Sequence, residues 1–76
     1  MRERKPMVVF TFYTTAAAMA MEKLCRERGL PGHLGPTPRS VTSDCGIAWL
    51  ASLPDREILE NAPGAPEFAG VFEREL

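Results

Sequence analysis

The fold is decided by MVVFTFY at residues 7–13 and the TTAAAMAMEKLCRERG that follows it at residues 14–29. The first segment is rich in β-branched and aromatic residues, which predicts a buried strand. The second is rich in strong helix formers and predicts a helix over residues 16–28. A hydroxyl from Thr14 or Thr15 is placed to cap the start of this helix, and Gly29 to end it in a left-handed conformation. The chain therefore begins with a strand joined directly to a helix.

This helix has one apolar face at three-and-four spacing, with charged residues on its other side. The residues of that face are Ala17, Ala18, Met21, Leu24 and Cys25. We expect the face to pack against the sheet, which would make Cys25 an inert core thiol.

Downstream, composition predicts four more elements: a weak strand within 30–37, a strand at 47–51, a short helix at 55–61 and a last strand at 68–72. The first of these is weak because it contains several glycines and prolines. In the short helix, we expect Ile58, Leu59 and Ala62 to point inward. Residues 73–76 are expected to trail away. The order of elements predicts an α+β fold of the ferredoxin-like βαββαβ type, an antiparallel four-stranded sheet with two helices on one face.

With 76 residues the chain has room for one domain, so we expect a flexible tail at 1–6 and a single domain at 7–76. The net charge of −1 gives no attraction for nucleic acid or anionic membranes. Two cysteines form no disulfide framework and are expected to be reduced, which favours a cytoplasmic location. An alternative interpretation of residues 2–21 as a secretory signal is disfavoured by Glu3 and by the threonines that interrupt the apolar run.

The predicted first strand is apolar on both of its faces. Val8, Phe10 and Phe12 alternate with Val9 and other largely apolar residues. Helices on one side of the sheet leave the other side in water, and large apolar patches on monomers are uncommon. We therefore expect a second copy or a partner protein to cover that face.

Polar and reactive side chains are concentrated in the segment PTPRSVTSDCG, residues 36–46. Cys45 is the candidate functional thiol, because a thiolate needs exposure and groups that stabilise its charge. The groups that could bind there are Arg39, Ser40, Thr42, Ser43, Asp44 and Gly46. The guanidinium group of Arg39 can hold an anion. Gly46 permits a sharp backbone turn beside the sulfur. The carboxylate of Asp44, next to the thiol in the chain, opposes its ionisation. The alternative is a simple turn between two strands that contains a structural cysteine.

Other reactive residues are few. His33, the only histidine, is expected to be a half-exposed strand residue with nothing to place it near Cys45. No metal-ligand spacing, glycine-rich phosphate loop or serine nucleophile motif is present, so we expect no metal and no cofactor.

The segment that runs from Pro36-Thr-Pro-Arg39 through the serine-rich run to Cys45-Gly46-Ile47-Ala48 resembles a family of small prokaryotic proteins known as "putative selenium/sulfur carrier protein-like". The resemblance spans residues 7–73. It implies a loop cysteine that holds sulfur or selenium, with Cys45 as the carrier thiol, Gly46 as its turn residue and Arg39 as an anion contact. Members of that family often carry Ser-Thr-His-Asp where this chain has Tyr13-Thr-Thr-Ala16. The difference removes a histidine and an aspartate from the start of the helix.

The sequence thus favours a sulfur or selenium carrier that exchanges its cargo with donor and acceptor proteins, and not an enzyme with turnover. Two alternatives stay open. One is a dimerising interaction module in which Cys45 is structural. The other is a redox-sensing thiol that forms a sulfenate or an intermolecular disulfide.

Overall fold

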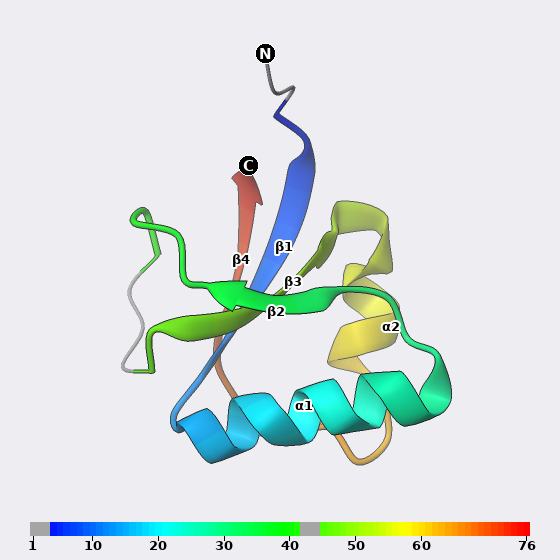
Figure 1. The fold of residues 1–76 in the computed structure, drawn as a ribbon. Helices are drawn as coiled ribbons and strands as arrows, with labels where there is room; N and C mark the ends of the chain where they lie inside the picture. Colours follow the sequence, from blue (N-terminus) through cyan, green and yellow to red (C-terminus); the bar gives the residue numbers. More distant parts are fainter. Residues whose placement is uncertain (1–3, 42–44) are drawn as a thin grey trace.

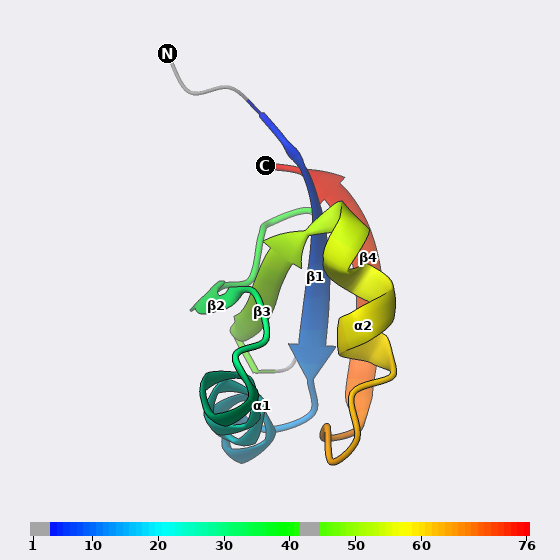
Figure 2. The same cartoon turned by 90° about the vertical axis from the view of Figure 1, so that its right-hand side faces the viewer.

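The structure is a computed structural model that describes residues 4–41 and 45–76. Its elements, in chain order, are β1 (Pro6–Phe12), α1 (Thr15–Arg28), β2 (His33–Pro36), β3 (Ile47–Ser52), a 3₁₀ turn (Leu53–Asp55), α2 (Arg56–Glu60) and β4 (Phe68–Glu75). The four strands form one sheet in the order β2-β3-β1-β4 (Figures 1 and 2). All three strand pairs are antiparallel.

The predicted strand-helix unit is present, and both ends of its helix are capped as expected. Thr14 has extended backbone geometry, and its side chain accepts from the Ala17 amide at 3.1 Å. At the other end Gly29 adopts a left-handed conformation, with φ of 66°. In that geometry the Gly29 amide reaches the Cys25 carbonyl, which the helix itself leaves unsatisfied.

The two chain ends are paired with each other, which differs from the sequence prediction. The strand β4 continues to Glu75, whereas residues 73–76 were expected to trail away. The Lys5 amide donates to the Leu76 carbonyl at 2.9 Å, and the Leu76 amide donates to the Lys5 carbonyl at 3.0 Å. Within the predicted tail at 1–6, Lys5 and Pro6 thus pair with the end of the chain, because β4 extends far enough to reach them.

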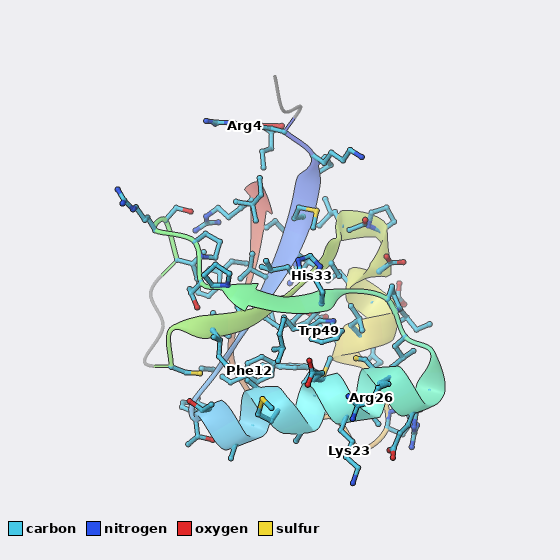
Figure 3. The ribbon with its side chains drawn as sticks, viewed as in Figure 1. Arg4, Phe12, Lys23, Arg26, His33 and Trp49 are labelled. Carbon is cyan, nitrogen blue, oxygen red and sulfur yellow. The ribbon has the colours of Figure 1, made fainter. Side chains whose placement is uncertain are left out.

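One face of the sheet packs against both helices. The strands contribute Val8, Phe10 and Phe12 from β1 and Trp49 and Ala51 from β3 to this core, and the helices contribute Ala18, Met21, Cys25 and Leu59. The Phe68 ring of β4 lies 4.8 Å from that of Phe10 and 5.8 Å from that of Phe12, measured between centroids. In Figure 3, Phe12 and Trp49 lie between the sheet and α1. We call this set the helix-side core.

The opposite face is covered in large part by the chain itself. Val41, from the connection between β2 and β3, packs on Val9 and Ala48 and is only 6% exposed. The Phe72 ring folds over Gly70, where an added Cβ would lie 2.6 Å from the ring. The sequence prediction did not foresee that a loop would provide this cover. The expected second copy or partner on this face stays a prediction.

The second helix is shorter than predicted, and it buries a different set of residues. Leu59 is fully buried, whereas Ile58 is 54% exposed, so the expectation that both point inward is wrong for Ile58. The reason is length: α2 has five residues, about one turn and a half, and so short a helix buries only a narrow stripe. Ser52 precedes the 3₁₀ turn and forms no side-chain cap bond to it.

These elements make an α+β fold with a four-stranded antiparallel sheet and two helices. The strand order is compatible with the predicted ferredoxin-like arrangement. Within the described residues, no helix is both long and apolar enough to span a membrane.

The neighbouring residues Leu59 and Ile58 give a matched test of this packing. Leu59→Ala leaves a cavity in the helix-side core, and we expect it to lower the free energy of unfolding by about 2–5 kcal/mol. Ile58→Ala removes an exposed side chain and should change that energy by no more than about 0.5 kcal/mol. Urea denaturation followed by circular dichroism measures both. Equal losses for the two variants would contradict the orientation of α2.

Candidate functional site

Cys45 lies at the end of the connection between β2 and β3. The two strands pair through Pro36 and Ile47, and one further bond extends the ladder, from the Thr37 amide to the Gly46 carbonyl at 3.0 Å. Gly46 has φ of 76°, a left-handed conformation that glycine adopts without strain. Gly46 therefore has the backbone conformation expected of a turn residue, and its predicted role at the thiol stays a prediction. Because this turn is fastened to the sheet, it fixes the backbone next to Cys45.

The side chain of Cys45 lies on the helix side of the sheet. It is half-buried and packs against the helix-side core. Its Sγ is 3.9 Å from the Oγ1 of Thr15, the first residue of α1. Figure 1 shows the beginning of β3 on the same side of the molecule as the start of α1. The thiol is thus held at the N-terminus of a 14-residue helix, whose partial positive charge favours nearby anions.

Sequence reasoning missed Thr15 as a site residue. It considered the threonines only as helix caps, and Thr14 takes that role. The sequence nevertheless contained an indication of its importance. Thr15 lies in the segment Tyr13–Ala16, where this chain differs from the family it resembles. The structure shows that Thr15 of this segment and Cys45 are neighbours in space, although they are 30 residues apart in the chain.

The other predicted site residues fall into three groups. Ser40 is turned toward β4, where its hydroxyl accepts from Arg74 Nε at 3.2 Å. Arg39 is exposed, and its predicted contact with an anion at the thiol stays a prediction. Thr42, Ser43 and Asp44 lie outside the described residues.

Cys25 has a different environment from Cys45, although both are thiols. Cys25 is 1% exposed in the helix-side core, and burial raises the pKa of its thiol because a thiolate there would lose its hydration. It lies ten residues after Thr15 in the same helix, about 15 Å along the helix axis. This separation places Cys25 far from the end of the helix that Cys45 contacts. The two sulfurs are not arranged as a resolving pair.

His33 is exposed on the edge strand β2, on the opposite side of that strand from α1 (Figure 3). It pairs with Leu50, three positions or about 10 Å along β3 from Ile47, and Cys45 precedes the start of that strand. The histidine is therefore not positioned as a base for the thiol. Among the described residues, no group of three or more histidine, cysteine or acidic side chains could hold a metal ion.

A cavity of about 310 Å³ opens between α1 and β2. The residues that line it are Glu22, Cys25, Arg26, Leu30, Gly32, His33, Leu34 and Trp49. All of its helix residues belong to the second half of α1, whereas Cys45 contacts the first residue of that helix. The cavity and the thiol are thus separate features of the surface.

The raised pKa of Cys25 predicts a pH dependence of stability. The Cys25 thiol stays protonated in the folded state at pH values where it ionises in the unfolded chain. Its contribution to the free energy of unfolding is therefore complete below the ordinary thiol pKa, about 8.5, and is lost as the pH rises above that value. At pH 7 we expect Cys25→Ala to cost about 1 kcal/mol in the free energy of unfolding. This difference from the wild type should shrink between pH 8 and pH 10 (about the thiol range) in urea denaturation.

Ala18→Gly is the matched control, because Ala18 is buried on the same helix and carries no ionisable group. Its cost should not depend on pH. A pH-independent difference between the wild type and Cys25→Ala would contradict the prediction.

A model of one protein family matches this chain over residues 7–63, which include β1, both helices, β2, β3 and Cys45. Comparison with curated proteins and with solved structures found no match. The matched segment covers well over half of the 76 residues and agrees with the resemblance carried by residues 36–48. The chain therefore belongs to the family described as "Putative Se/S carrier protein-like".

Proposed function

We propose that the protein carries sulfur or selenium on Cys45. The observation that carries this proposal is the placement of Cys45, half-buried and 3.9 Å from Thr15 at the start of α1. A helix N-terminus favours anions, so it suits both a thiolate and the terminal anion of a persulfide. The name of the family supports the same cargo.

The proposed chemistry is persulfide exchange. The Cys45 thiolate attacks the outer sulfur of a donor persulfide, which forms the new S–S bond on Cys45 and releases the donor as a thiolate. An acceptor thiolate then attacks the outer sulfur on Cys45, and Cys45 leaves as a thiolate. Each step follows the rules of thiol–disulfide exchange and needs no outside oxidant or reductant. With selenium, the intermediate is a selenosulfide.

The proposed carrier depends on its donor and acceptor proteins and works in the cytoplasm, where thiols stay reduced.

Mass spectrometry after incubation with glutathione persulfide tests the proposal. We expect the wild type to gain one sulfur atom, located on Cys45 by peptide mapping, because Cys45 is the accessible thiol. Cys45→Ser should gain none. Cys25→Ala is the matched control and should still be loaded, since it removes only the core thiol.

Alkylation of Cys45 by iodoacetamide over a range of pH separates the two alternatives from the proposal. Rapid alkylation without a stable sulfur adduct would favour a redox-sensing thiol. Slow alkylation, together with unchanged behaviour of Cys45→Ser, would favour a structural cysteine in an interaction module. Either result would overturn carriage by Cys45.

A further inference from the structure

The floor of the cavity between α1 and β2 is apolar. Trp49 of β3 lies between the sheet and α1 (Figure 3), and its indole Nε1 donates to the Pro31 carbonyl at 3.0 Å. Because the polar atom of the indole is already satisfied, the rest of the ring offers mainly apolar contact. Leu34, which pairs with Trp49 in the β2–β3 ladder, and Leu30 line the cavity beside it. A ligand that reaches this floor therefore needs an apolar group.

The floor is a preformed part of the fold. A Cβ added at Gly32 would lie 2.3 Å from Trp49 Nε1 and 2.8 Å from the Leu50 carbonyl oxygen, so only glycine lets the backbone pass this close to the indole. At the other end of the same connection, the Leu30 amide donates to the Cys25 carbonyl at 2.9 Å. The connection is thus held at both ends, and the indole with it. Sites for small molecules are usually preformed in this way.

Two opposite charges on α1 line the same cavity. Glu22 is half-buried and Arg26 is exposed, and they are four positions apart, so their side chains leave one face of the helix with Cβ atoms about 5–6 Å apart. A glutamate four residues before a basic residue is the order that favours an ion pair. Among the described residues, however, neither group forms one, and the ion pairs found there involve Arg56. A carboxylate and a guanidinium are therefore both available to a ligand.

The other two titratable residues of the cavity add no charge on its helix side. His33 lines the β2 edge, but its side chain lies on the opposite side of that strand from α1 (Figure 3). Cys25 is 1% exposed, and burial raises the pKa of its thiol, which keeps the thiol neutral at pH 7. The cavity thus presents one negative and one positive group beside an apolar floor.

We propose that this cavity binds a free α-amino acid with an apolar side chain. Arg26 holds the carboxylate, Glu22 accepts from the ammonium group, and the side chain of the ligand lies against Trp49. The two charges of an α-amino acid are separated by only two bonds of about 1.5 Å each, which suits a pair of opposite charges on one helix face. A volume of about 310 Å³ is at the lower end of the range for small-molecule sites, so a single amino acid matches its size. The proposal does not depend on the carrier function, because the cavity and Cys45 are separate.

The fluorescence of Trp49, the only tryptophan in the chain, tests the proposal directly. The full chain is titrated with L-leucine, and binding is measured in parallel by calorimetry. We expect a saturable change in fluorescence. N-acetyl-L-leucine lacks the ammonium group and L-leucinamide lacks the carboxylate, so each should need an about three- to tenfold higher concentration for half-saturation. Glycine has no side chain to place on the indole and should bind at least about tenfold more weakly.

Variants of α1 assign the two charges to their partners. We expect Arg26→Gln and Glu22→Gln each to weaken the binding of L-leucine by about three- to tenfold. In Arg26→Gln, L-leucine and L-leucinamide should bind equally, because the carboxylate has then lost its partner. Lys23→Gln and Glu27→Gln are the matched controls. They remove the same kinds of charge from exposed positions of the same helix that do not line the cavity, and they should bind as the wild type does.

Three results would overturn the proposal. The first is the absence of saturation with L-leucine in both fluorescence and calorimetry. The second is equal binding of L-leucine and its two analogues to the wild type, because the charges would then play no part. The third is equal weakening in the cavity variants and their controls, which would assign the effect to the net charge of the helix and not to the cavity.

Discussion

The central strand β1 has no face that it can leave in water. Val8, Phe10 and Phe12 point to one side and Val9 to the other, and all four are fully buried. A sheet covered by helices on one side only would expose Val9 and its neighbours, at a cost of roughly 25 cal/mol for each Å² of apolar surface. The chain avoids much of this cost by laying Val41 over Val9 and Ala48. Burial of both faces of β1 therefore involves Val41, a residue of the β2–β3 connection.

The same constraint creates the candidate site. The connection covers one face of the sheet through Val41, and at its end Cys45 packs on the other face, beside the first residue of α1. Cys45 becomes a half-buried thiol at a helix N-terminus, whereas Cys25 on the same helix-side core is sealed from water. The two thiols thus lie in different environments. Burial favours the neutral form of Cys25, whereas Thr15 at the helix N-terminus gives Cys45 a polar neighbour.

Sequence patterns were reliable where short-range physics decides the outcome. The composition of residues 7–13 and 47–51 predicted β1 and β3 to within one residue at each end, and the helix start at Thr14 and its end at Gly29 follow from local capping chemistry. Predictions failed where strand pairing or the length of an element decides the structure. The strand β4 continues to Glu75 because β1 offers partners along its whole length, and Ile58 is exposed because the short helix α2 presents only a narrow face to the core.

The sequence by itself determined the α+β class and the burial of Cys25, and it singled out Cys45 with Gly46 as the proposed site. Each of these depends on residues a few positions apart, which local periodicity and backbone preferences can indicate. Only the tertiary structure decided that Thr15 contacts the sulfur, that Val41 covers the second face and that Ser40 binds Arg74, 34 residues later. These contacts join distant parts of the chain. Their partners are set by strand order and register, which bring together side chains that no local pattern in the sequence connects.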